Sequence, residues 1–128
     1  MIELVIYGPP VGKGRPRFGR AKNGNVVTFT PSKTRHYEQG VRALAQVAMM
    51  NKTVLEGPVK VTLTAYFSHK TKTGWHVSRP DLDNIVKAVL DGLNGIVFDD
   101  DDNVCHLVAM KKYAENTEER VEVQIENA

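Results

Sequence analysis

Carboxylates and one lysine are concentrated in residues 81–103 of this chain. Asp81 and Asp83 stand two positions apart, Lys87 follows four positions later, and four consecutive aspartates occupy positions 99–102. Neighbouring carboxylates repel one another, so such a cluster is stable mainly in water or around a cation. Carboxylate oxygens are the ligands that Ca²⁺ and Mg²⁺ prefer. If these acids converge in the fold, they predict a divalent-metal site with a lysine beside it.

Simpler interpretations of the same residues remain open. Asp81 follows a proline and precedes an apolar helical pattern, so it also suits the N-cap of a helix. Asp83 and Lys87 are spaced i, i+4 and can form a surface ion pair worth about 0.3–0.5 kcal/mol. The acidic run at 99–102 is also typical of a solvated loop between two elements.

Two motifs with similar residues are excluded. An EF-hand loop starting at Asp99 would place Val104 at the glycine position and Met110 at the position of the bidentate glutamate. The stretch GPPVGKG (8–14) has the wrong spacing for a phosphate loop, and Gly14 stands where Ser or Thr is required. We therefore expect neither an EF-hand calcium site nor a nucleotide cofactor.

Basic residues are segregated from the acids, although the formal net charge is only +2. Residues 1–42 contain eight Lys and Arg against two acids, whereas residues 81–103 contain seven acids and one base. A basic surface suits a polyanion such as nucleic acid, while an acidic patch on the same protein suits a cation. A solvated surface loop is the alternative for the basic N-terminal segment. The candidate phosphate-contacting residues are Lys13, Arg15, Arg17, Arg20 and Lys22 in the N-terminal segment, Lys70 and Lys72 in a later loop, and Arg79 before the acids.

The loop at 68–80 also contains one tryptophan and one histidine. Trp75 could stack on a nucleobase, but single tryptophans are usually buried, so packing in the core or in a dimer interface is the favoured interpretation. His76 has no His or Cys partner at ligand spacing and is expected to be a surface or packing residue. Lys111 and Lys112 are expected to extend the basic rim.

Hydrophobic periodicity predicts an α/β (α+β) domain spanning residues 1–128, with two main helices packed on a mixed β-sheet. Strands are predicted at 2–7, 58–67, 104–113 and 120–126, with a short extended segment at 26–30 and a basic loop at 8–25. Helices are predicted from Pro31, capped by Thr30, to about residue 50, and at about 82–94. The last two strands are predicted to form a hairpin.

The chain shows no sign of membrane association. No apolar stretch approaches the roughly 18 residues of a membrane span. The N-terminus lacks the basic head of a signal peptide, and the single cysteine, Cys105, cannot form an internal disulfide. We expect a soluble, cytoplasmic protein with no membrane partner.

The segment around the acids resembles the signature of a known family. RPDLDNIVKAVLDGLNGIVFDDDDNV (79–104) is similar to the pattern of the RusA family of Holliday junction resolvases, which runs K/R-P-D-x-D-N-x-x-K, then D-x-L-N-G, then D-D-x-Q. GKGRPRF (12–18), FTPSKTRHYE (29–38) and KKYAENTEERVEVQIE (111–126) also match the layout of that family. The resemblance covers nearly the whole chain.

The resemblance implies an endodeoxyribonuclease dependent on Mg²⁺, with Mn²⁺ expected to substitute. It would resolve four-way junctions by paired symmetric nicks as a homodimer, in DNA recombination and repair. Nuclease action on flaps or forks, and non-catalytic nucleic-acid binding, are the alternatives.

The functional residues of the family carry over to particular positions of this sequence. Asp81, Asp83 and Asp101 correspond to the metal ligands, and Lys87 corresponds to the catalytic lysine. Asp100 is the alternative to Asp101, because this chain has Asp102 where a small residue is usual and Asn103 where Gln is usual. The acidic run therefore leaves the register open by one residue.

Overall fold

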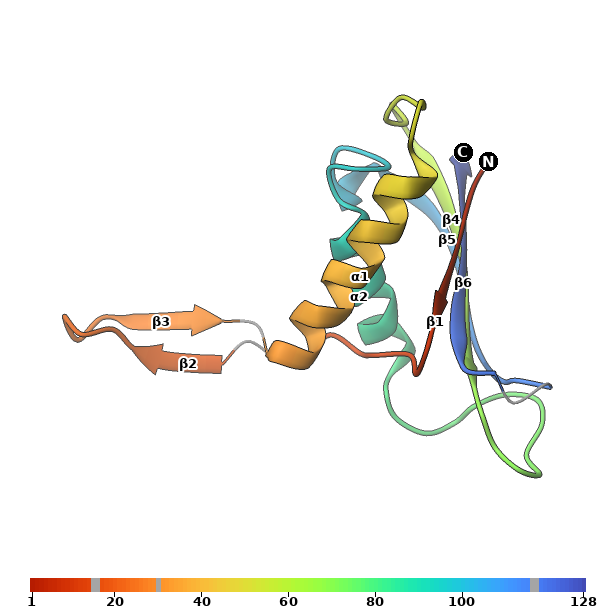
Figure 1. Cartoon of the computed structure of the whole chain (residues 1–128), viewed down its shortest axis with the longest axis horizontal. Coiled ribbons are helices and arrows are strands. Elements are labelled where there is room, and N and C mark those ends of the chain that lie inside the picture. Colours follow the sequence, from red (N-terminus) through yellow and green to blue (C-terminus); the bar gives the residue numbers. More distant parts are fainter. Residues whose placement is uncertain (15–16, 30, 116–117) are drawn as a thin grey trace.

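A four-stranded sheet carries two helices on one of its faces (Figure 1). The computed structural model describes residues 1–14, 17–29, 31–115 and 118–128. The sheet consists of β1 (Ile2–Tyr7), β4 (Val59–Phe67), β5 (Val104–Tyr113) and β6 (Arg120–Asn127), in the order β1-β6-β4-β5. The helices are α1 (Ser32–Ala48) and α2 (Leu82–Leu93), and a short 3₁₀ turn, η1 (Asp101–Asn103), precedes β5. The predicted mixed sheet with two packed helices is confirmed.

The core lies between the sheet and the helices. Successive side chains of a strand point to opposite faces, and every second residue of β4, from Val59 to Phe67, is buried. Val121, Val123 and Ile125 of β6 continue this apolar layer, and Ile85, Val89 and Leu93 of α2 cover it. The helical spacing of these α2 residues turns its polar face, which includes Lys87, away from the core.

The last two strands do not form the predicted hairpin. β6 lies between β1 and β4 and pairs antiparallel with both, whereas β5 pairs in parallel with β4. Parallel neighbours need a crossover connection, and α2 with its flanking loops provides it between β4 and β5. The central position suits β6, because its inward residues are almost completely buried. β5 takes the edge and leaves Cys105–Val108 exposed.

The predicted basic loop at 8–25 contains an additional strand. β2 (Arg17–Arg20) pairs antiparallel with β3 (Val26–Phe29), and the two form a hairpin arm that projects away from the helices and the sheet (Figure 1). Gly24 has a φ of +85° in the turn of this arm, a conformation that favours glycine. The extended segment predicted at 26–30 is therefore strand β3 as far as Phe29.

The start of α1 differs slightly from the prediction. Pro31 occupies the N-cap position and the helix begins at Ser32, whereas Pro31 was expected to be the first helical residue. Thr30, the expected cap, lies outside the described residues. α1 ends at Ala48, close to the predicted end. No helix in the described part of the chain is long and apolar enough to cross a membrane.

Candidate functional site

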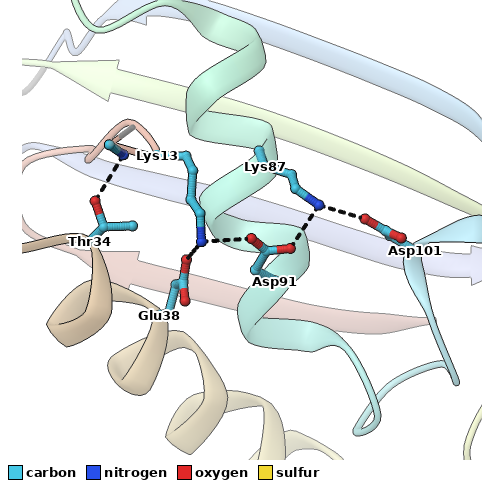
Figure 2. Close-up of polar contacts among 7 residues, drawn as sticks. Lys13, Thr34, Glu38, Lys87, Asp91 and Asp101 are labelled. Atoms are coloured by element: carbon cyan, nitrogen blue, oxygen red, sulfur yellow. Dashed lines mark hydrogen bonds and ion pairs between the residues drawn. The ribbon is translucent and has the colours of Figure 1, made fainter. Parts of the chain in front are cut away.

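Lys87 lies between two carboxylates that come from different elements (Figure 2). Its Nζ is 3.0 Å from Oδ1 of Asp91, one turn further along α2, and 3.0 Å from Oδ2 of Asp101 in η1. The hydrogen bonds to Asp101 and Asp91 raise the pKa of Lys87. The ammonium of Lys87 is therefore a positive charge held between two carboxylates.

The conformation of η1 gives the four aspartates different roles. Asp100 is the N-cap, and its Oδ1 accepts a hydrogen bond of 2.8 Å from the backbone N–H of Asp101. Asn103 closes the cap, because its Oδ1 accepts from the backbone N–H of Asp100. Asp101 instead points at Lys87, whose hydrogen bond holds the pKa of Asp101 below its ordinary value. Asp99 and Asp102 are exposed.

Asp91 is shared between Lys87 and a second lysine, which sequence reasoning did not connect to it. Nζ of Lys13 is 3.0 Å from Oδ2 of Asp91 and 2.6 Å from Oε1 of Glu38 on α1. Burial alone would lower the pKa of Lys13, but the hydrogen bonds to Glu38 and Asp91 outweigh it and raise that pKa. A chain of alternating charges therefore runs from Glu38 through Lys13, Asp91 and Lys87 to Asp101 (Figure 2).

The N-terminal segment is attached to both helices at Lys13. Its backbone N–H donates to the carbonyl of Asn84 in α2, at 2.8 Å. The next N–H, of Gly14, donates to Oγ1 of Thr34 in α1, at 3.0 Å (Figure 2). Lys13 was predicted to contact phosphate, and the structure places its ammonium between two carboxylates.

Asp81 and Asp83 lie at the start of α2, where the helix dipole favours anions. Asp81 occupies the predicted N-cap position, but its side chain makes no capping hydrogen bond. One oxygen of Asp83 accepts a hydrogen bond of 2.9 Å from the backbone N–H of Asn84. The i, i+4 ion pair of Lys87 is formed with Asp91, so Asp83 is not the partner that the spacing suggested.

The segment that leads to Asp81 is anchored from β5. Nζ of Lys111 donates to the carbonyls of Ser78, at 2.7 Å, and Pro80, at 2.9 Å. Lys111 was expected to extend the basic rim, but these bonds direct it to the backbone before α2. No local sequence signal connects residues so far apart.

An open cleft of about 680 Å³ lies beside Asp81. Its walls include Lys13, Lys33, Arg79, Pro80 and Asp81. Arg79 was predicted as a phosphate contact, whereas Lys33 was missed because an exposed lysine in a helix carries no distinctive signal. Cationic walls beside a carboxylate suit the phosphate backbone of a nucleic acid.

The other predicted phosphate contacts lie away from this cleft. Arg20 is on the hairpin arm, where its Nη1 donates to the carbonyl of Gly24 at 3.2 Å. Lys70 and Lys72 are exposed in the loop after β4. Arg15 lies outside the described residues, and of Arg17 only the backbone position in β2 is described.

Trp75 and His76 have opposite environments. The tryptophan is 64% exposed, so the predicted core packing is wrong. The histidine is buried and stacks on Phe67, with ring centroids 3.8 Å apart. It is thus a packing residue, as expected.

The aspartates provide the oxygen ligands that Mg²⁺ prefers, but they do not surround a metal position. Among the residues that the structure describes, no three His, Cys, Asp or Glu side chains are close enough together to hold a metal ion. Mg²⁺ usually keeps several waters and takes only one or two carboxylates from the protein. Asp81, Asp83 and Asp101 each offer carboxylate oxygens, which are the type of ligand that Mg²⁺ prefers.

Comparison with known proteins identifies the family of this chain. The sequence model of the family described as Endodeoxyribonuclease RusA matches residues 7–126. The chain is also similar to the protein YqaN of Bacillus subtilis (strain 168), with 36% identity over 138 residues that cover 97% of this chain and 94% of that protein. The family match includes both helices, β4, β5, most of β6 and the Lys87–Asp101 pair, and it begins at the last residue of β1. The chain belongs to the RusA family of endodeoxyribonucleases.

Proposed function

We propose that this protein is a Mg²⁺-dependent endodeoxyribonuclease that resolves four-way DNA junctions by paired, symmetric nicks. The observation that supports it most is the ion pair between Lys87 and Asp101 in a chain of the RusA family. Lys87 follows Asp83 by four residues, so the pair lies on the face of α2 that Asp83 occupies at the start of the helix. These are the residue types that phosphodiester hydrolysis with a metal ion requires.

Asp81, Asp83 and Asp101 would hold the metal ion, with Asp100 as the alternative to Asp101. When it is bound, Mg²⁺ neutralises charge on the phosphate and makes its bound water more acidic. Mn²⁺ should substitute for it. Lys87 adds a positive charge where negative charge develops on the phosphate. Asp91 holds that ammonium in place together with Asp101.

Cationic side chains would bind the DNA backbone around the reacting phosphate. Lys33 and Arg79 line the cleft beside Asp81. Arg20 on the arm and the exposed Lys70 and Lys72 extend the positive surface, as would Arg15 and Arg17. Binding of this kind weakens steeply as the salt concentration rises.

A homodimer with two-fold symmetry suits the substrate. The two cuts that resolve a four-way junction are related by a two-fold axis, and an isologous dimer presents two identical sites in that relation. The homodimer stays a prediction for this chain.

The test compares a labelled four-way junction, a fork and a linear duplex, each incubated with Mg²⁺ or with EDTA. Paired nicks in opposite strands of the junction, with Mg²⁺ and not with EDTA, are the expected result. Asp81→Asn should abolish the nicks and preserve junction binding, and Asp102→Asn is the matched control. Preferred cutting of the fork would identify a nuclease for other branched DNA. Junction binding without cleavage in any divalent metal would identify a non-catalytic binding protein.

A further inference from the structure

A row of alternating aromatic and cationic side chains crosses the sheet on the face opposite the helices. The strand register places Tyr7 of β1 opposite Arg120 of β6, and Arg120 opposite Tyr66 of β4. Tyr66 lies opposite Lys112 of β5, and an antiparallel bridge places Trp75 opposite Lys112. Residues directly opposite one another on paired strands share a face. The five side chains therefore form one row across the end of the sheet.

The row faces outward. Ile6, Val121 and Ala65, which adjoin three residues of the row in the sequence, are buried under the helices. Because successive side chains of a strand point to opposite faces of the sheet, the side chains of the row point to the helix-free face. Tyr7 is 67% exposed and Trp75 is 64% exposed. Two large aromatic side chains are thus available to a partner.

The cations lie over the rings. Nζ of Lys112 is 5.3 Å from the ring centroid of Trp75, and Cζ of Arg120 is 4.1 Å from that of Tyr66. Arg120 is further held by Glu122 and by the carbonyl of Glu118. Cation–π contacts of this kind keep a positive charge beside each aromatic face.

The backbone around Trp75 is held in place. The N–H of His76 donates to the carbonyl of Lys111 at 3.1 Å, and the N–H of Tyr113 donates to the carbonyl of Gly74 at 2.8 Å. The stacking of His76 on Phe67 fixes the same segment from the core side. The indole is therefore presented from an isolated β-bridge beside the end of β5.

A hollow of about 700 Å³ opens beside the indole. Its lining includes Tyr66, Lys112, Tyr113 and Glu115. The hollow combines aromatic surface with two cations, Lys112 and Arg120, and the carboxylate of Glu115. A carboxylate at such a place can accept a hydrogen bond from the amino group of a base.

We infer that this row binds an unpaired nucleotide of a DNA strand, with its base stacked on Trp75 and its phosphate at Lys112. Base–aromatic stacking tolerates every base, because each has a π-face. Stacked bases in a duplex hide those faces, whereas bases next to a branch point can be splayed out. The exposed Lys70 and Lys72 in the same loop add positive charge for the adjoining phosphates.

The surface is distinct from the candidate active site. Asp101 lies in η1 directly before β5, whereas Lys112 is near the far end of that strand and on the helix-free face. Glu122 lies two residues after Arg120 on the same face of β6. Because its carboxylate repels a polyanion, we expect DNA to contact only the end of the sheet where the row lies. The inference rests on the proposed function, because branched DNA supplies the unpaired nucleotide.

Trp75 is the single tryptophan of the chain, so intrinsic fluorescence reports on this surface directly. The protein in EDTA is titrated with a short single-stranded oligonucleotide, with a four-way junction and with a blunt duplex. We expect quenching by the oligonucleotide and the junction, and little quenching by the duplex.

Substitutions separate stacking from general DNA binding, measured by the anisotropy of a labelled oligonucleotide. Trp75→Ala should weaken single-strand binding by about 5-fold to 150-fold, the range for loss of one stacked base. Trp75→Phe should retain most of the affinity. Val77→Ala is the matched control, because Val77 is an 88% exposed apolar residue of the same loop outside the row.

The outcomes distinguish this inference from the proposed function. A protein that nicks junctions with Mg²⁺, but shows no quenching and no loss of affinity in Trp75→Ala, would overturn the inference alone. Quenching by single strands and a loss of affinity in Trp75→Ala, without nicking of any branched substrate, would support the inference while the proposed catalytic function fails. A fluorescence that changes when the protein is diluted, and does not change when DNA is added, would show that the row contacts a second copy of the chain. This result would overturn the inference.

Discussion

Nζ of Lys87 lies 3.0 Å from Oδ2 of Asp101, although the two residues are 14 positions apart and belong to different elements. The contact selects one carboxylate from four consecutive aspartates. It also keeps Lys87 protonated, because the charged form of each partner is stabilised by the other. The same pair defines which residues should matter most for catalysis.

The four aspartates should differ sharply when they are replaced. Asp101→Asn should lower the rate of Mg²⁺-dependent junction nicking by about 100-fold or more, because Asp101, the proposed metal ligand and the partner of Lys87, loses its charge. Asp100→Asn should retain most activity, because asparagine is also a good N-cap. Asp102→Asn is the exposed control. Loss of activity in Asp100→Asn together with full activity in Asp101→Asn would show that the ligand register is shifted by one residue.

Asp91→Asn should reduce both stability and activity. The substitution weakens the ion pairs of the half-buried Lys13 and of Lys87 at once. We expect the free energy of unfolding in urea to fall by about 1–2 kcal/mol and nicking to fall by about 10-fold, since Lys87 is no longer held from both sides.

The control for Asp91 is Glu122→Gln. It breaks the pair between Arg120 and Glu122, whose carboxylate is more exposed than that of Asp91, and should change the free energy of unfolding by less than about 0.5 kcal/mol. Wild-type stability and activity in Asp91→Asn would contradict the role given to Asp91.

His76 should make the protein less stable in mild acid. Burial lowers the pKa of His76, as do Lys111 and Lys72, and Glu119 opposes them only in part. The unfolded chain therefore binds a proton near the ordinary pKa of 6.5, while the folded protein binds it only at lower pH. The contribution of neutral His76 to the free energy of unfolding is therefore fully present above pH 6.5. The free energy of unfolding should decrease as the pH falls below 6.5, by no more than about 1.4 kcal/mol per pH unit for one proton.

Urea unfolding at pH 7.5, 6.5 and 5.5 measures this effect. His76→Phe, which keeps an aromatic ring over Phe67, should flatten the dependence over this range. His36→Asn changes an exposed histidine and should leave the dependence unchanged. An equally steep dependence in His76→Phe would assign the effect to other groups.

Gly92 should be essential for the approach of the two helices. A Cβ at this position would lie 2.7 Å from Cβ of Val41 and 3.0 Å from the carbonyl oxygen of Glu38. Gly92→Ala should therefore lower the free energy of unfolding by about 1–3 kcal/mol. Gly40→Ala is the matched control in α1, where a Cβ would meet nothing within 4 Å. This control should raise stability by about 0.5–1 kcal/mol, and a thermal melt of each variant distinguishes the two outcomes.

Local patterns were sufficient for most of the elements. Strict alternation in Val59–Phe67 and helical spacing in Leu82–Leu93 identify both elements and the face that each buries. Such periodicities depend only on the geometry of one strand or one helix. The motif that contains Asp81, Asp83 and Lys87 was equally visible, because its residues lie within two turns of one helix.

The sequence by itself therefore determined most of the elements and the faces that they bury, and it predicts metal-binding chemistry for the acids. Only the tertiary structure decided that β6 separates β4 from β1, that Lys13 and Lys87 share Asp91, and that Trp75 is exposed. Periodicity shows which face of an element is buried, but it does not show which element lies beside it. Contacts between residues far apart in the chain depend on helix packing and on the β4–α2–β5 crossover, which no local pattern encodes.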